Sequence, residues 1–203
     1  MGSDCIKILA TGHYLPSKVL TNEELCENIP ELTSDWIIKK TGIKKRYHVT
    51  ENDTASSMAV EAFNDLSSKY YIDKSDIDLV IVASFSQDYL FPPVSAKIHS
   101  LLGFKKECQI IDINTNCVGL VTALTIASER MMCDSSLGKA LVIGVEVLSR
   151  FTNPKDKETA IFFSDGASAV VLGRSSESIG FKAATFLTDS STYESVRMRG
   201  GGS

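Results

Sequence analysis

One cysteine of this chain stands where a buried strand is predicted to turn into an apolar helix. The strand covers residues 109–113, and the helix is predicted to run from Cys117 to residue 132. The first turn of a helix carries free backbone N–H groups and a partial positive charge, and both stabilise a thiolate relative to a thiol. A thiolate is a usable nucleophile at neutral pH. Gly119 would let a ligand or another backbone segment come close to this turn. The pattern leaves two roles open for Cys117, a nucleophile or a small core residue.

The other residues that could carry chemistry form no second pattern of this kind. The remaining cysteines fall in predicted strands, helices or loops and are interpreted as structural thiols: Cys5, Cys26, Cys108 and Cys133. The five cysteines are odd in number, widely spaced and without a CxxC pair, which predicts reduced thiols, as in the cytoplasm. The histidines are far apart in the chain, so neither a catalytic dyad nor a metal site is predicted at His13, His48 or His99. Asp165 is expected in a turn that leads into a strand, and no glycine-rich phosphate loop occurs.

The composition is that of an ordinary globular protein. The 203 residues are 43% hydrophobic and 23% charged, with a formal net charge of −4. A nucleic-acid-binding protein normally shows a basic field, so that class is not expected. The apolar runs are far shorter than the roughly 20 residues that span a bilayer, so no membrane helix is expected. The basic runs Lys39-Lys40 and Lys44-Lys45-Arg46 are interpreted as a solvated face, with a phosphate contact as the alternative.

Strands and helices alternate along the chain. Predicted strands cover residues 5–10, 78–84, 109–113, 139–147 and 167–173, with a further candidate at 179–187. Helices are predicted after a Thr21–Glu24 capping box and over residues 34–40, 54–70, 92–102 and 117–132. The strands are continuous apolar runs, which is typical of an α/β domain with a mostly parallel sheet buried on both faces.

The chain is predicted to form a single domain over residues 4–188. Residues 1–3 are interpreted as a leftover of an expression tag, and the glycine-rich residues 189–203 as a linker or a truncation point.

Seven short segments, in this order and at this spacing, resemble the β-ketoacyl-acyl-carrier-protein synthase III family. They are TGHYLP (11–16), TSDW (33–36), KTGI (40–43), FP (91–92), NCVG (116–119), VLSR (147–150) and FSDGA (163–167). The resemblance implies a thiolase-like fold, of which this chain is the N-terminal half of a layered α-β-α-β-α architecture. The C-terminal half would be absent.

The resemblance also implies roles for individual residues. Cys117 matches the family's nucleophile, which takes an acyl group from acyl-CoA before decarboxylative condensation with malonyl-carrier protein. Trp36 matches the tryptophan that stacks on the CoA adenine, and Lys40 a basic residue near the CoA phosphates. Phe91 matches an aromatic residue that reaches across a homodimer interface into the partner's acyl pocket, and Leu148 another position of that pocket. No tightly bound cofactor is implied, and the enzyme is expected in the cytoplasm.

Three positions depart from the family pattern. Lys157 replaces an arginine that packs on the adenine, and lysine lacks the planar guanidinium needed for stacking. Phe85 and Asn116 are bulkier than the residues usual there, which predicts a narrow acyl pocket and a short primer such as acetyl. The family's catalytic histidine and asparagine come from the second half, so this chain is expected to be catalytically incomplete in condensation.

Two alternatives remain open at the level of the sequence. One is a thiolase-fold acyltransferase or condensing enzyme of secondary metabolism, which the changes at Phe85, Asn116 and Lys157 favour. The other is a non-catalytic assembly fragment, because half of a two-part fold should expose apolar surface where the other half would pack.

Overall fold

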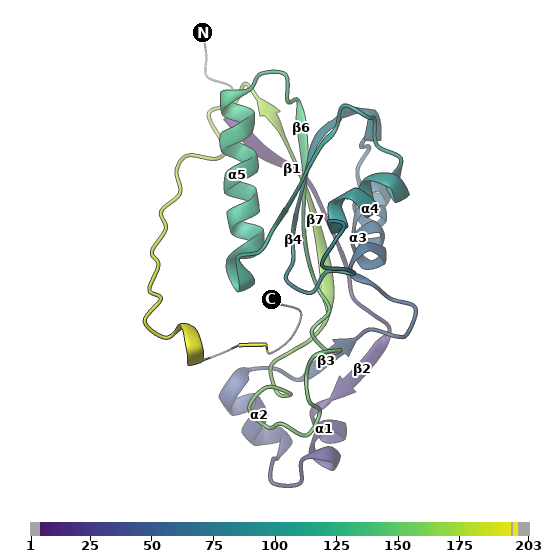
Figure 1. Cartoon of the computed structure of the whole chain (residues 1–203), viewed down its shortest axis with the longest axis vertical. Coiled ribbons are helices and arrows are strands. Elements are labelled where there is room, and N and C mark those ends of the chain that lie inside the picture. The colour runs from purple at the N-terminus through teal and green to yellow at the C-terminus, as the bar shows by residue number, and fades with distance from the viewer. Residues whose placement is uncertain (1–4, 196, 199–203) are drawn as a thin grey trace.

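The core of the molecule is a mixed sheet (Figure 1). The computed structural model describes residues 5–195, 197 and 198, and the sheet within them has five strands. In spatial order these are β1 (Cys5–Tyr14), β7 (Gly166–Ser175), β6 (Lys139–Glu146), β4 (Ile77–Ala83) and β5 (Gln109–Ile113). β4 pairs in parallel with β5 and β6, whereas β7 is antiparallel to β6 and β1. All strands except β7 therefore point the same way, which confirms the predicted mixed, mostly parallel sheet.

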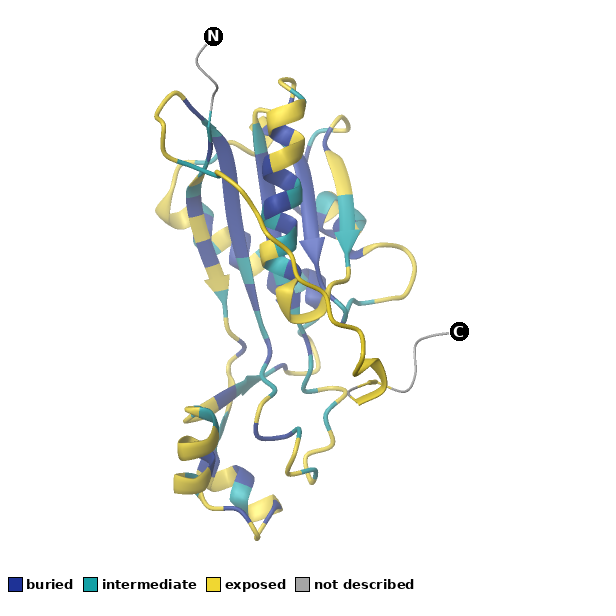
Figure 2. Ribbon diagram, turned by 90° about the vertical axis from the view of Figure 1, so that its left-hand side faces the viewer, coloured by how far each residue is buried: buried dark blue, intermediate teal, exposed yellow. Residues whose placement is uncertain are grey.

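Helices cover both faces of this sheet. They are α3 (Ala55–Lys69) and α4 (Val94–Leu102) on one face and α5 (Gly119–Cys133) on the other. Side chains alternate along a strand, so β4 places Val80 and Val82 in the core beneath α3 and α4, and Leu79 and Ile81 in the core beneath α5. Figure 2 shows the central strands buried along most of their length. This two-sided burial explains the unbroken apolar run at residues 79–83.

A smaller lobe lies beyond one end of the sheet (Figure 1). It contains β2 (Lys18–Thr21), α1 (Asn22–Asn28), α2 (Ser34–Thr41) and β3 (Lys45–His48). α1 begins with the predicted capping box, in which Glu24 N donates to Thr21 Oγ1 at 3.2 Å and Thr21 N donates to the Glu24 carboxylate at 2.8 Å. α2 ends at Gly42, whose φ of 75° lies in the left-handed region that favours glycine. The antiparallel β2–β3 ribbon was not predicted from the sequence.

The basic run in β3 is not wholly the solvated face expected from the sequence. Lys44 and Lys45 are exposed, but Arg46 is completely buried. Its guanidinium donates to Asn22 Oδ1 at 2.8 Å and to the carbonyl of Ile161 at 3.1 and 2.5 Å. Burial lowers the pKa of Arg46. Arg46 thus ties β3 to the start of α1 and to the loop that precedes β7.

Three other predictions need correction or completion. The first strand continues past residue 10 to Tyr14, and the helix expected at Cys117 begins instead with a 3-10 turn, Asn116–Val118. The strand expected at residues 179–187 is wrong, since that segment has no strand pairing among the described residues and runs along the outside of the molecule (Figure 2). Short 3-10 helices also occur at Lys74–Asp76 and Tyr193–Ser195. The presumed tag residues 1–3, residue 196 and residues 199–203 of the glycine-rich end lie outside the described residues.

Candidate active site

Cys117 lies at the edge of the sheet where the parallel strands β4, β5 and β6 end. It occupies the 3-10 turn between β5 and α5, and its side chain is exposed. The preceding Asn116 has a φ of 50°, a left-handed conformation that asparagine tolerates better than most residues. A Cβ atom at Gly119 would lie 3.0 Å from Cβ of Ala83, so this glycine lets α5 begin directly against the end of β4. These features confirm the predicted strand–turn–helix setting of Cys117.

Asp112 connects the end of β5, which leads to Cys117, to the start of α4. α4 begins after Pro93, which has no side chain able to cap a helix. The Asp112 carboxylate supplies the cap, because it accepts hydrogen bonds from Val94 N at 2.7 Å and Ser95 N at 3.0 Å. A carboxylate at a helix N-terminus also meets a partial positive charge. The end of β5 and the start of α4 are thereby joined.

A hollow of about 570 Å³ surrounds Cys117. Its walls come from the ends of β4 and β6, the starts of α5 and β7, and residues 162–165. Phe85 and Leu148, both expected at the acyl pocket, line this hollow. Phe91 does not line it, and this residue is 85% exposed. The structure therefore brings Phe85 and Leu148 together with Cys117 and leaves Phe91 on the surface.

Glu146, which the sequence analysis did not single out, lines the same hollow with a partly buried carboxylate. Phe85 N donates to it at 3.3 Å, and the hydroxyl of Ser86 donates to its other oxygen. The Ser86 hydroxyl in turn accepts from Val147 N at 2.7 Å. Burial raises the pKa of Glu146, and these hydrogen bonds only partly oppose the effect. Glu146 thereby holds Phe85 and Ser86, which follow β4, against the end of β6.

Asp165 lines the hollow as well, but its carboxylate is buried and fully engaged. It accepts from Val49 N at 2.7 Å, from Ser149 N at 2.8 Å and from the Ser149 hydroxyl. Its own N–H donates to the carbonyl of Tyr47 at 2.7 Å. The residue does sit in the predicted turn before β7. Its role in the structure is to join the lobe, the loop after β6 and the sheet.

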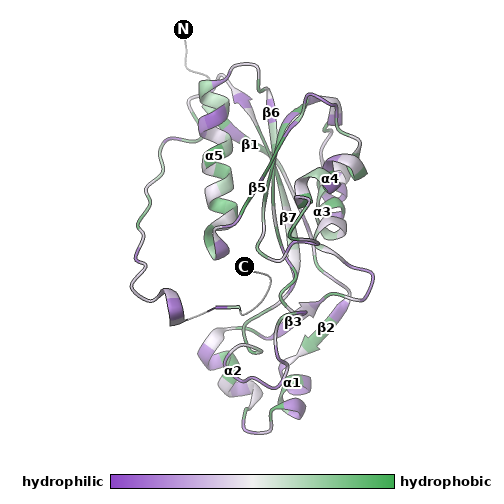
Figure 3. Cartoon of the chain, in the orientation of Figure 1, coloured by the Kyte–Doolittle hydropathy of each residue, from purple (hydrophilic) through white to green (hydrophobic). Residues whose placement is uncertain are grey.

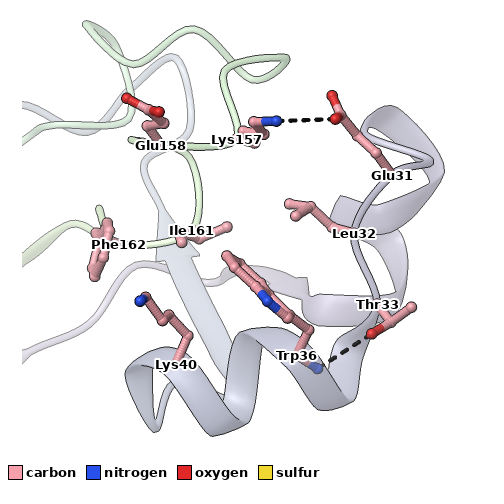
Figure 4. A pocket seen from close by; sticks show the side chains of 9 residues that line it. All are labelled: Glu31, Leu32, Thr33, Trp36, Lys40, Lys157, Glu158, Ile161 and Phe162. Atoms are coloured by element: carbon pink, nitrogen blue, oxygen red, sulfur yellow. Dashed lines mark hydrogen bonds and ion pairs between the residues drawn. The ribbon is translucent and has the colours of Figure 1, made fainter.

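A second pocket, of about 640 Å³, lies between the lobe and the loop of residues 148–163 (Figure 4). Trp36, Lys40 and Lys157, the three residues expected to contact CoA, all line it. Trp36 is held at the start of α2, where its backbone N–H donates to Thr33 Oγ1 at 3.2 Å, and its ring faces into the pocket. Phe162 lines both this pocket and the hollow around Cys117, so the two spaces adjoin.

An ion pair crosses this second pocket. Lys157 Nζ lies 3.0 Å from a carboxylate oxygen of Glu31, a residue that the sequence analysis did not identify (Figure 4). The hydrogen bond that Lys157 donates to Glu31 raises the pKa of Lys157. Glu158 also lines the pocket, and Ile161, whose carbonyl accepts from the buried Arg46, forms part of its wall. The loop that carries Lys157 is therefore anchored through Arg46.

The histidines do not approach Cys117. His13 is exposed beside Asp65, His99 Nε2 lies 2.9 Å from the carbonyl of Lys105, and none of the three lines the Cys117 hollow. Burial lowers the pKa of His48. In the described part of the chain, no three His, Cys, Asp or Glu side chains are grouped as a metal site would require. No helix there combines the length and the apolar character that crossing a membrane requires.

Comparison with known proteins yields consistent similarities. A model of the family described as 3-oxoacyl-[acyl-carrier-protein (ACP)] synthase III matches residues 111–190. The β-ketoacyl-[acyl-carrier-protein] synthase III 1 of Vibrio vulnificus is 42% identical over 174 residues, which cover 84% of this chain and 53% of the relative. The β-ketoacyl-[acyl-carrier-protein] synthase III structure from Thermus thermophilus superposes with a TM-score of 0.86 at 31% identity, over 93% of this chain and 57% of that chain. The priming β-ketosynthase of the R1128 polyketide biosynthetic pathway gives a TM-score of 0.80 at 29% identity, over 85% of this chain and 51% of that chain.

These similarities confirm the resemblance and the thiolase-like α/β fold expected from the sequence. The chain spans about half the length of the curated relatives that it matches.

Proposed function

The chain belongs to the β-ketoacyl-acyl-carrier-protein synthase III family, and from this premise we propose that Cys117 accepts an acyl group from a short acyl-CoA. The Cys117 sulfur attacks the thioester carbonyl, the bond to the CoA sulfur breaks, and the acyl group ends as a thioester on Cys117. The malonyl group of a carrier protein then loses CO₂, and the resulting carbanion attacks this thioester and releases Cys117. The product is a β-ketoacyl-carrier protein, which initiates fatty-acid synthesis.

The observation that carries this proposal is the pair of adjoining spaces. Cys117 is exposed in one of them, and Trp36 with Lys40 and Lys157 lines the other. Trp36 is 45% exposed, which leaves an aromatic surface on which an adenine can stack. The lysine ammonium groups suit phosphates as point charges. A donor whose nucleotide lies by Trp36 can pass its thioester beside Phe162 toward Cys117.

The walls around Cys117 support a short primer. Phe85 and Leu148 both face this hollow, and the Glu146 carboxylate adds a polar group to it. A partly buried carboxylate makes an unfavourable lining for a long aliphatic chain. Acetyl is therefore the primer that we propose.

Condensation is proposed for the whole protein, and acyl transfer for the part that this chain provides. The resemblance places the family's catalytic histidine, its asparagine and one oxyanion-hole N–H outside the segments matched here. Developing negative charge on the thioester oxygen needs such donors, which often supply several kcal/mol each. None of the three histidines of this chain lines the Cys117 hollow.

We also propose a homodimer, formed along the edge of the sheet. β5 is one of the two edge strands, and its first residues Gln109 and Ile110 are exposed. An unpaired edge with apolar surface is a template for pairing with a second chain. Leu90 and Phe91 stand exposed on the loop after β4, which supports the expected reach of Phe91 into a partner's pocket. All five cysteines are free, in keeping with a reducing, cytoplasmic location.

A condensing enzyme of secondary metabolism is the second candidate, favoured by the similarity to the R1128 priming ketosynthase. A panel of acyl-CoA primers, assayed with malonyl-carrier protein on the whole protein, separates the two. Acetyl-CoA giving acetoacetyl-carrier protein as the best product supports the proposed function. Transfer of an intact acyl group without loss of CO₂, or a strong preference for another primer, supports the alternative.

A further inference from the structure

The ion pair between Glu31 and Lys157 spans the pocket that we assign to the donor nucleotide. Glu31 lies in the segment between α1 and α2, and Lys157 comes from the loop of residues 148–163 on the facing wall. Figure 4 shows the pair bridging the two walls above the Trp36 ring. Both side chains remain well exposed, at 66% for Glu31 and 50% for Lys157. The ion pair is therefore an exposed contact at the mouth of the pocket and not a buried one.

The charges that line this pocket cancel. Lys40 and Lys157 contribute two positive charges, and Glu31 and Glu158 contribute two negative ones. A CoA molecule carries a diphosphate and a further ribose phosphate, so it is strongly anionic. A pocket without net charge gives such a ligand no overall Coulomb attraction. One of the two cations, Lys157, already has a carboxylate partner, Glu31.

A phosphate can replace the Glu31 carboxylate as the partner of Lys157, because an exposed ion pair of this kind is weak. The displaced carboxylate nevertheless stays on the pocket wall, where it repels the same phosphate. The resulting penalty rises with the negative charge that the ligand brings. It does not apply to the uncharged adenosine part, which Trp36 can stack regardless of Glu31.

We propose that Glu31 is a specificity-determining residue of the donor pocket, which weakens binding of highly phosphorylated donors relative to donors with less charge. The inference rests on the proposed function, in that the pocket receives the nucleotide end of a CoA thioester. It implies that this pocket discriminates against the ribose phosphate of CoA, so that Glu31→Gln shifts the preference toward full CoA.

The single tryptophan makes a direct test possible. Trp36 is the only tryptophan of the chain and lines the pocket, so its fluorescence reports binding there. The wild-type chain and Glu31→Gln are titrated with CoA, dephospho-CoA and adenosine. Glu27→Gln is the matched control, since it removes the same charge from an exposed position of α1 outside the pocket. Urea unfolding of each variant confirms that all of them are folded.

We expect the gain in binding affinity to increase with the negative charge of the ligand. Glu31→Gln binds CoA about fivefold more tightly than wild type at low salt, dephospho-CoA with a smaller gain, and adenosine unchanged. The gain for CoA shrinks as added salt screens the repulsion. Glu27→Gln leaves all three affinities unchanged.

Two results would overturn the inference while leaving the nucleotide site intact. One is CoA binding by Glu31→Gln with wild-type affinity, and the other is an equal gain for CoA and adenosine, which would mean that the substitution merely widens the pocket. A different failure is distinguishable: if neither CoA nor adenosine changes the Trp36 fluorescence in any variant, the proposed nucleotide site itself is wrong.

Discussion

At the scale of single residues, the surroundings of each thiol separate a candidate nucleophile from structural cysteines. Burial raises the pKa of Cys108 to about 11, so this thiol stays protonated and unreactive at neutral pH. Cys117 is exposed and lines a hollow, whereas Cys133, also exposed, lies at the end of α5 outside it. Position in the fold, rather than residue type, therefore singles out Cys117.

Glu146 should make the stability of the chain depend on pH in an identifiable way. Burial raises its pKa above the ordinary value of 4.5, so the folded state binds this proton more tightly than the unfolded chain does. Its contribution to the free energy of unfolding is complete below the ordinary value and declines as the pH rises through the raised pKa. Wild type should therefore lose stability relative to Glu146→Gln over that range, as urea unfolding measures. A difference between the two that is independent of pH, or that matches the exposed control Glu51→Gln, would contradict this assignment.

Arg46 contacts the donor pocket through the carbonyl of Ile161, which lines it. Arg46→Met removes a buried guanidinium and leaves the Ile161 carbonyl and Asn22 Oδ1 without their donors. We expect a loss of about 3 kcal/mol in the free energy of unfolding. Chemical denaturation measures this loss, and Lys44→Met, an exposed neighbour, should change the free energy by less than about 0.5 kcal/mol. Equal effects of the two substitutions would show that the buried contacts of Arg46 do not stabilise the lobe.

At the scale of elements, local chemistry determined which predictions succeeded. The bounds of the strand at residues 109–113 and the capping box at Thr21 are confirmed, because both depend on neighbouring residues alone. The burial expected for that strand is wrong, since β5 is an edge strand whose residues are exposed or only partly buried. The β2–β3 ribbon escaped prediction because each strand has only four residues, and β3 is largely basic. Within it, the buried Arg46 bonds to Ile161, which is 115 residues away, and no local pattern contains such a contact. The prediction of a strand at residues 179–187 was wrong for a different reason. The apolar residues of this segment suit a strand locally, but the segment pairs with no strand among the described residues.

Gly12 sets the distance between β1 and α3. A Cβ atom at this position would lie 2.4 Å from the carbonyl oxygen of Ala62 and 2.5 Å from Leu66 N. Both atoms belong to the backbone of α3, so the helix must move to admit a methyl group. We expect Gly12→Ala to lower the free energy of unfolding by about 2 kcal/mol. Thermal or urea unfolding measures the loss, and the exposed neighbour Thr11→Ala is the control; a stable Gly12→Ala variant would mean that α3 packs less closely than described.

At the scale of the whole molecule, the candidate site lies where the lobe meets the sheet. Trp36, Lys40 and Lys157 could be predicted as a group because the resemblance links residues far apart in the sequence, and the structure brings them into one pocket. Glu31 and Glu146 could not be predicted from the sequence, because the contacts that mark them as part of the site are with residues distant in the chain. Figure 3 shows hydrophobic residues along much of α5, and Val118 and Val121 near its start are exposed beside the site. The expected docking of a second thiolase-like half on such surface remains a prediction.

The central claim is that Cys117 takes an acyl group from an acyl-CoA. The most direct measurement is intact mass spectrometry of this chain after incubation with acetyl-CoA, with Cys117→Ala as the control. The account predicts a mass increase of one acetyl group in the wild-type chain and none in the variant. An increase that persists in Cys117→Ala, or a folded whole protein that no acyl-CoA acylates at Cys117, would contradict it.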